Sequence, residues 1–436
     1  MTIGRLQGTP DRTPGRIQSP DPARRTSLVV SLVGLAVFVG LVVALVPWDP
    51  AGTPLRVPSA STLLTADEIA RAESYSRAAR WTGWGALAIS LVAVIWLAAV
   101  PRGRRLASRI LERLRGPWWV RVVLGVLLMT VAVRVLTLPF AVVTQSRRHD
   151  VGLSTQSWLG WARDVATNLL VGVVVTSLVV LVLVACARRW SRAWPVVAGS
   201  TLAGAVLLGS FVYPLVVEPL FNSFTSLPDG DLRAQVLAIA DREGVPVSDV
   251  LVADASRRTT TLNAYVSGFG STRRVVLYDN LVDDLPEDEA LSVVAHELAH
   301  AKHRDVLVGS VLGAAGAFMG VGLLGMVLSS GFVRRRLGVT LAAGALAVPL
   351  LIALVDLGSL MASPVQNGIS RRIEMRADVD ALRVTRDPDA FVEMQRMLAR
   401  RSLSDPTPPA LSQWWFGSHP TMLERVALAR RSGSVR

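Results

Sequence analysis

Three residues in the second half of the chain have the types and spacing of a hydrolytic metal site. His296, Glu297 and His300 form an HExxH pattern within AHELAHAKHRD, residues 295 to 305. In a helix, four residues span a little over one turn, so both imidazoles project from one face toward a single metal ion. The glutamate between them can activate a water molecule there as a base. This pattern is typical of zinc hydrolases, and two surface histidines on an amphipathic helix are the alternative.

The surrounding residues favour a helix that holds the pattern. Pro286 suits a first helical position, and three acidic residues follow it in the first turn. An apolar stripe runs through Leu291, Val294, Ala295 and Leu298. At about 100° per residue, the two histidines lie on the opposite side. One face of the predicted helix therefore packs, and the metal-binding face points into a cleft.

A zinc hydrolase needs a third protein ligand and an open fourth position for water. His303 is the nearest candidate, but on a continuous helix it lies about 10 Å along the axis from His296, which makes it an awkward ligand. Glu374 and Asp378 are the better pair, because they lie at positions i and i+4 of a predicted helix. Glu374 can bind the metal while Asp378 accepts a hydrogen bond from a ligand imidazole. A surface carboxylate pair beside arginines is the alternative.

The chain as a whole is too apolar for a soluble protein. It has 436 residues, of which 51% are hydrophobic, and a mean hydropathy of +0.43. Seven segments are long enough to cross about 30 Å of hydrocarbon: 27–47, 81–100, 119–143, 165–187, 194–217, 306–329 and 337–361. The predicted fold class is a multi-pass α-helical membrane protein with a small α/β, zincin-like metallopeptidase unit.

Five parts follow from this organisation. They are a disordered basic tail (1–26), a five-span region (27–217), the metallopeptidase unit (218–305), a two-span hairpin (306–361) and a C-terminal helical segment (362–436) that carries the third ligand. Within the unit, Asp229 or Asp231 can cap a helix that ends at Gly244. Strand-like runs cover 250–253, 259–267 and 274–278, and the turn at 268–271 makes the last two a hairpin. The strand before the metal helix is either a site for a peptide substrate or an ordinary sheet strand.

Charge and cysteine content exclude two other kinds of site. The net charge is +13, but almost all of it is arginine spread over loops, and Lys302 is the only lysine, which argues against a nucleic-acid-binding stripe. Cys186 is the only cysteine, so there is no disulfide framework or thiolate cluster. One zinc per chain must therefore be held by histidine and carboxylate. The expected partners are a peptide or protein substrate and the lipid bilayer, and the oligomeric state is not indicated.

A series of motifs resembles the type I CaaX prenyl protease family, integral-membrane zinc metallopeptidases with HExxH and a distant glutamate ligand. In order, they are LPF (138–140) with the following HDVGLS, EPLFNSF (218–224), NAY (263–265), HELAH, SRRIE…AD and SHP (418–420). The resemblance implies zinc on His296, His300 and Glu374, Asp378 beside them, and His419 with Arg425 near the oxyanion. It also implies a substrate-facing strand at Asn263, Ala264 and Tyr265, and seven helices enclosing a chamber.

The chain departs from this family next to the metal helix. The family commonly has HELGHWK followed by a further histidine, whereas Ala299, Ala301 and Asp305 stand at those places here. The chain also lacks a long insertion before the metal helix. The core chemistry is untouched, but the departures leave the prenylation of the substrate open.

The expected function is a zinc-dependent membrane metalloendopeptidase that cleaves membrane-associated or lipid-modified, CaaX-like proteins. Zinc polarises the scissile carbonyl, and Glu297 takes a proton from water and passes it to the leaving amine. The alternatives are general membrane-protein quality control and a non-catalytic transporter or scaffold, for which Arg134 and Asp356 inside spans would mark a polar path. An intramembrane protease is disfavoured by the charged run at 287–305.

Two indications of membrane orientation disagree. The tail and the even-numbered short loops carry 17 arginines against seven on the opposite side, which predicts a cytoplasmic amino terminus. After an odd number of spans, the HELAH unit and the carboxyl terminus then face outward. The family resemblance implies a cytosolic active site instead, and the arginine count is slightly favoured.

Overall fold

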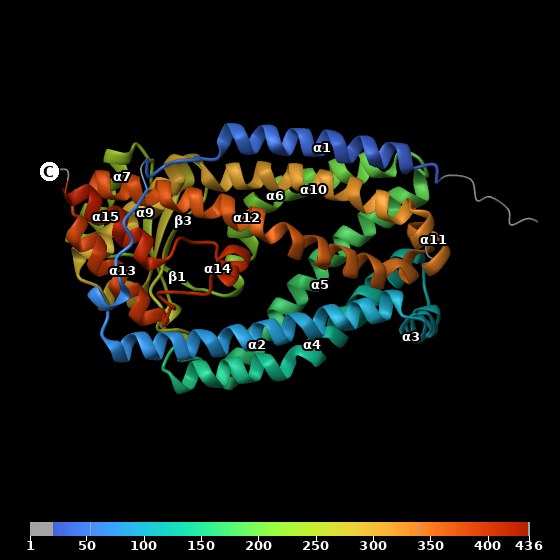
Figure 1. The fold of residues 1–436 in the computed structure, drawn as a ribbon, viewed down its shortest axis with the longest axis horizontal. Helices are drawn as coiled ribbons and strands as arrows, with labels where there is room; N and C mark the ends of the chain where they lie inside the picture. Colours follow the sequence, from blue (N-terminus) through green and yellow to red (C-terminus); the bar gives the residue numbers. More distant parts are fainter. Residues whose placement is uncertain (1–20, 53, 339, 435–436) are drawn as a thin grey trace, which may run out of the picture.

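The computed structural model describes residues 21–434 except 53 and 339. In this part of the chain, seven helices are long and apolar enough to cross a membrane. They are α1 (Arg24–Leu45), α2 (Ala66–Ala99), α4 (Trp118–Asp150), α5 (Trp158–Arg189), α6 (Trp194–Val216), α10 (Asp305–Ser329) and α12 (Val348–Thr385). They confirm the prediction of seven spans, and most of them run along the longest axis of the molecule (Figure 1). Most of the predicted tail lies outside the described residues, and α1 already begins at Arg24.

The shorter elements gather mainly at the two ends of these helices. At one end lie α3 (Pro101–Glu112) and α11 (Gly331–Leu337) (Figure 1). The opposite end carries the sheet together with α7 (Asp231–Glu243), α8 (Asp279–Asp284), α9 (Glu287–Lys302), α13 (Pro388–Ser402) and α15 (Met422–Ser434). The short helix α14 (Ala410–Phe416) lies between this unit and the long helices. The HExxH residues are therefore at the end of the molecule remote from α3 and α11.

A four-stranded sheet supports the HExxH helix. Its strands are β1 (Phe224–Ser226), β2 (Asp249–Ala253), β3 (Ala264–Ser267) and β4 (Arg274–Tyr278), in the order β1-β2-β4-β3. Strands β2 and β4 are parallel, and the pairs β1–β2 and β3–β4 are antiparallel. Val294 and Leu298 of α9 are buried in one hydrophobic core with Val275 and Leu277 of β4. Strand β3 is at an edge of the sheet, on the side next to β4.

The structure corrects two predictions in this unit. The strand predicted over 259–267 begins only at Ala264, because Asn280 donates hydrogen bonds to the carbonyls of Thr259 and Thr261 and draws that backbone out of the sheet. Residue Gly230, rather than an aspartate, precedes α7, and no side chain caps the helix there. The predicted end holds, since Gly244 has a left-handed φ of 67°.

Several helices extend well beyond the predicted spans. Helix α2 begins at Ala66, where Thr65 and Glu68 form a reciprocal capping box, although the apolar span was predicted from residue 81. Its first half contacts the catalytic end: Ser76 donates to the carbonyl of Leu403, and Arg80 forms an ion pair with Asp405 at 2.9 Å. These extensions fix the unit around α9 to the membrane helices.

The seventh span and the segment with Glu374 form one helix, not two. The span was predicted to start at residue 337, but Gly338 and Gly344 adopt positive φ values and α12 starts at Val348. The helix then continues through Pro364 to Thr385. Glu374 and Asp378 are thus carried on an extension of a membrane helix.

The two charged residues predicted inside spans remain apart from any ion pair. Arg134 lies in α4 and Asp356 in α12, and both are half-buried. Neither forms an ion pair with another described residue.

Candidate functional site

The HExxH residues lie in the last two turns of α9, on a helix as the sequence predicts. The helix is fixed from behind by its buried apolar stripe, so the opposite face presents the two imidazoles. Nε2 of His296 and Nε2 of His300 face one another at 3.2 Å. His296 is buried and His300 is half-buried. Two imidazole nitrogens that face one another this closely are placed to hold one cation between them.

Glu374 of α12 supplies the third donor, a carboxylate oxygen, to the same point. One of its carboxylate oxygens, Oε2, lies 3.2 Å from Nε2 of His296, and the other, Oε1, lies 3.6 Å from Nε2 of His300. Ligand atoms from the three residues all fall within 4.8 Å of one another. Oε2 is buried and receives no hydrogen bond of good geometry. The two imidazole nitrogens and the carboxylate can therefore act together as ligands of one metal ion.

The spacing of these atoms fits a tetrahedral metal ion. Bonds of about 2.0–2.1 Å to a tetrahedral centre place neighbouring ligand atoms about 3.3 Å apart. Among His296, His300 and Glu374, the two shortest separations between ligand atoms are both 3.2 Å. Two imidazoles and one carboxylate are also a donor set that catalytic zinc sites use, with the fourth position open.

A buried ion pair holds the first imidazole in this orientation. Nδ1 of His296 lies 2.9 Å from Oδ1 of Asp378, whose side chain is fully buried. Arg425 of α15 donates to both oxygens of Asp378, at 2.5 and 2.8 Å. Burial alone lowers the pKa of His296, but the hydrogen bond and charge of Asp378 outweigh it and raise that pKa to about 9. The carboxylates around this imidazole thus favour positive charge in the site.

The second imidazole has a partner that the sequence reasoning missed. Nδ1 of His300 lies 2.9 Å from Oδ2 of Asp305, the first residue of α10. Arg376 of α12 pairs with the other oxygen of Asp305. The sequence contained one signal for this contact: Asp305 was among the departures from the family pattern.

Glu297 lies between the two histidines in sequence and is half-buried. Burial raises the pKa of its carboxyl, and the nearby imidazoles lower it in part. No hydrogen bond to its carboxylate occurs among the described residues. A glutamate with a raised pKa and no fixed partner can both take up and release a proton.

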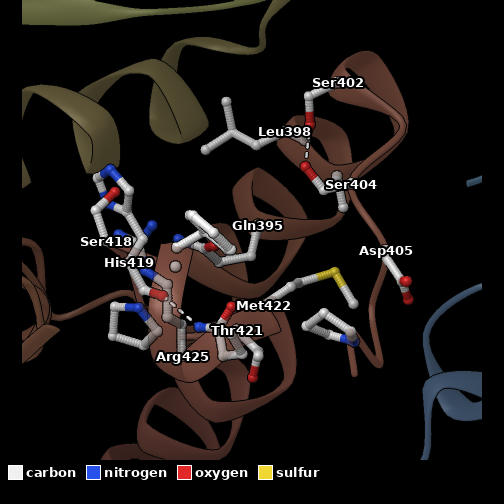
Figure 2. A pocket seen from close by; sticks show the side chains of 16 residues that line it. Gln395, Leu398, Ser402, Ser404, Asp405, Ser418, His419, Thr421, Met422 and Arg425 are labelled. Atoms are coloured by element: carbon white, nitrogen blue, oxygen red, sulfur yellow. Dashed lines mark hydrogen bonds between the residues drawn. The ribbon is translucent and has the colours of Figure 1, made fainter. Parts of the chain in front are cut away.

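His419 lies in the loop between α14 and α15 and also reaches this site. Its Nδ1 is 2.9 Å from Oε2 of Glu374, and 61% of its side chain is exposed. Gln413 of α14 donates to the His419 carbonyl at 2.7 Å and fixes the loop. His419 and Arg425 also line a cavity of about 390 Å³, which Figure 2 shows running from Ser418 and His419 at one end to Asp405 at the other. Arg425 is committed to Asp378, while the exposed part of the His419 side chain can meet a ligand from the solvent side.

The remaining predicted residues flank the site. Asn263 is exposed just before β3, Ala264 is buried and Tyr265 is half-buried, and Asn263 accepts a backbone hydrogen bond from Tyr278 of β4. His303 is turned away from the two other histidines, since its Nε2 bonds to Asp380 of α12 at 2.6 Å. The structure therefore brings together His296, His300, Glu374, Asp378, His419 and Arg425. Ala264 and Tyr265 lie on the edge strand, and Asn263 lies just before it.

Two family models match successive parts of this chain. Residues 226–432 match the model of peptidase family M48, and residues 54–223 match that of the CAAX prenyl protease N-terminal region with five membrane helices. An uncharacterized metalloprotease of Bacillus subtilis, YhfN, is 28% identical over 70% of this chain and 72% of its own length. A CAAX prenyl protease 1 homolog of Arabidopsis thaliana is 32% identical over 49% of this chain. That alignment spans 51% of the plant protein.

One solved structure shares the fold over nearly the whole chain. The crystal structure of S. mikatae Ste24p matches with a TM-score of 0.74, covering 92% of this chain and 98% of that one. At 20% sequence identity, this likeness concerns the fold alone.

Proposed function

This chain belongs to peptidase family M48 and is a multi-pass membrane metallopeptidase, and we propose that its metal is one zinc ion held by His296, His300 and Glu374. The observation that carries the proposal is the convergence of their three donor atoms within 4.8 Å. Metal analysis of the purified protein tests it, with about one zinc per chain expected for a site of this type.

The residues around the proposed ion divide the work of peptide hydrolysis. Zinc, when bound, polarises the scissile carbonyl and makes water more acidic. Glu297 takes the proton of the attacking water and delivers it to the leaving amine, for which its raised pKa is suited. His419 donates to the carbonyl oxygen as negative charge develops there. Arg425 contributes through Asp378, because its guanidinium is already bonded to that carboxylate.

We assign the substrate backbone to the outer edge of β3. An edge strand has main-chain groups free to pair with an extended peptide. Asn263 is exposed just before this strand, Ala264 and Tyr265 are its first two residues, and β3 packs beside the HExxH helix. Pairing there would bring a peptide bond past His296 and Glu297.

The substrates are proposed to be membrane-associated or lipid-modified proteins of the CaaX type. Relatives of this chain support this class, since several of them are CAAX prenyl protease 1 homologs. General membrane-protein quality control is the second candidate, because Ala299, Ala301 and Asp305 depart from the family pattern. Membranes with wild-type enzyme and with Glu297→Gln are compared by proteomics. Accumulation of carboxyl-terminally extended precursors supports the first class, and accumulation of misassembled membrane proteins with unrelated termini supports the second.

For orientation, we propose that the catalytic end faces away from the cytoplasm. The arginine-rich helices α3 and α11 lie at the opposite end of the molecule (Figure 1). Arginine-rich loops remain on the cytoplasmic side of membranes. A reporter fused after Arg436 tests this: activity of an export-dependent phosphatase is expected. Fluorescence from a protein that matures only in the cytoplasm, without phosphatase activity, assigns the catalytic end to the cytosol instead.

A further inference from the structure

The corner between α9 and α10 places an aspartate against a proposed zinc ligand. Helix α9 ends at Lys302, Arg304 adopts a left-handed φ of 55°, and α10 begins at Asp305. On an uninterrupted helix, residue 305 would lie about 140° around the axis from His300 and about 7.5 Å along it. The turn at Arg304 changes the direction of the chain and brings Oδ2 of Asp305 to 2.9 Å from Nδ1 of His300. A left-handed conformation is unfavourable for a residue with a side chain, so the packing around this corner must hold it.

This contact determines which nitrogen of His300 can bind a metal. A carboxylate only accepts hydrogen bonds, so Nδ1 of His300 must carry the hydrogen. Nε2 then has its lone pair free, and it is Nε2 that faces His296 at 3.2 Å. The other oxygen of Asp305 is paired with Arg376. With 8% of its side chain exposed, Asp305 is held between the imidazole and the guanidinium.

The same arrangement occurs at the first imidazole, built from different elements. His296 is bonded to Asp378, and Asp378 is bonded to Arg425. Each imidazole is therefore backed by one aspartate, and each aspartate by one arginine. The four residues come from α10, α12 and α15, so the repetition does not follow from a local sequence repeat.

We propose that Asp305, held by Arg376, is a positioning residue that fixes the tautomer and the orientation of His300 as a zinc ligand. The proposal rests on the zinc ligands assigned above. It connects the metal centre to the sixth membrane helix, because Asp305 is the first residue of α10. It also assigns a role to one of the three residues at which this chain departs from the family pattern.

Asp305→Asn in the full-length protein tests the proposal through metal binding. Zinc affinity is measured by competition with a chromogenic chelator, and the visible absorption of the cobalt-substituted protein reports the ligand geometry. Asp305→Asn should weaken zinc binding by about 10- to 100-fold, the usual effect of removing such a partner, and should change the cobalt spectrum. Arg376→Met should change zinc affinity and the cobalt spectrum in the same direction, but by less. The variant that combines Asp305→Asn with Arg376→Met should bind zinc no more weakly than Asp305→Asn alone.

Two matched variants control for loss of a buried ion pair. Asp380 accepts a hydrogen bond from His303 and is paired with Arg383, and its side chain is 6% exposed. Asp380→Asn and Arg383→Met should leave zinc affinity and the cobalt spectrum unchanged. Equal effects of Asp305→Asn and Asp380→Asn on both readouts would overturn the proposal.

The outcomes also separate this proposal from the assignment of the ligands. If the wild-type protein binds no zinc, or if His300→Ala keeps wild-type affinity, the ligand assignment is wrong. If His300→Ala loses zinc but Asp305→Asn keeps wild-type affinity and spectrum, only the positioning role is wrong. If Asp305→Asn does not fold, Arg376→Met decides, because an unchanged cobalt spectrum in that variant refutes the role of the pair.

Discussion

His300 and His303 lie within one turn of each other at the end of α9, and each forms a hydrogen bond to an aspartate. His303 enters a cluster in which charges of opposite sign are matched. Its Nε2 bonds to Asp380, Arg383 pairs with the other oxygen, and Lys302 lies 2.6 Å from Glu243. His300 uses Nδ1 for its aspartate and directs Nε2 toward a second imidazole.

The two clusters differ in where their donor atoms point. Around His303, cations and carboxylates alternate. Around His300, two imidazole nitrogens and one carboxylate oxygen face a common point. Similar residues on the same two helices therefore form an ion-pair network in one place and a metal site in the other.

The largest effect is expected from removing a proposed zinc ligand from the His300 cluster, and none on zinc from the matching change in the His303 cluster. Glu374→Ala should lose the zinc and reduce peptide cleavage to background, because two imidazoles alone do not complete the site. His303→Ala should keep about one zinc per chain. Elemental analysis of the two purified variants makes the measurement. Zinc loss in His303→Ala with retention in Glu374→Ala would reverse the assignment of the two clusters.

The next effect separates catalysis from metal binding. Glu297→Gln keeps the size of the side chain and removes the base, so zinc content and thermal unfolding should remain as in the wild type. Turnover should fall by about 10²- to 10⁴-fold, the usual contribution of a positioned general base. Cleavage of a fluorogenic peptide measures it. A variant that cleaves at the wild-type rate with full zinc would remove Glu297 from the mechanism.

A smaller effect is expected at His419, where two roles can be told apart. If its side chain stabilises the developing oxyanion, His419→Ala should lower kcat by about 10²- to 10³-fold at unchanged zinc affinity. If it acts only on Glu374, from which it lies 2.9 Å, zinc affinity should fall instead. Parallel measurements of kcat and of chelator competition distinguish these cases, and loss of zinc alone would contradict the catalytic role.

Much of the fold could be predicted from the sequence, because its signals are local. Seven apolar stretches indicate the spans, and HExxH with its apolar stripe indicates the orientation of α9. Glu374 and Asp378 were found from their helical spacing and from the family resemblance. The three-residue strand β1 has no usable periodicity, and the ends of the long helices depend on contacts with the catalytic end rather than on hydropathy.

The partners of the two imidazoles required the structure. The contact of Asp305 with His300 depends on a left-handed residue at Arg304, and arginine gives no sequence signal for that conformation, unlike glycine. Arg376 is separated from Asp305 by the whole of α10 and much of α12. Arg425 was expected near the oxyanion, but the hydrogen bonds that commit it to Asp378 join two helices that are distant in sequence.

The smallest effect should come from the ion-pair cluster, and it should concern stability alone. His303→Ala removes one hydrogen bond to Asp380, whose negative charge remains balanced by Arg383 and Lys302. Because about a third of the His303 side chain is exposed, we expect a loss of only about 1 kcal/mol in the free energy of unfolding. Zinc affinity and kcat should stay within about twofold of the wild type, since no donor atom of the metal site is touched. A tenfold loss of zinc affinity in this variant would mean that the two clusters on α9 act as one.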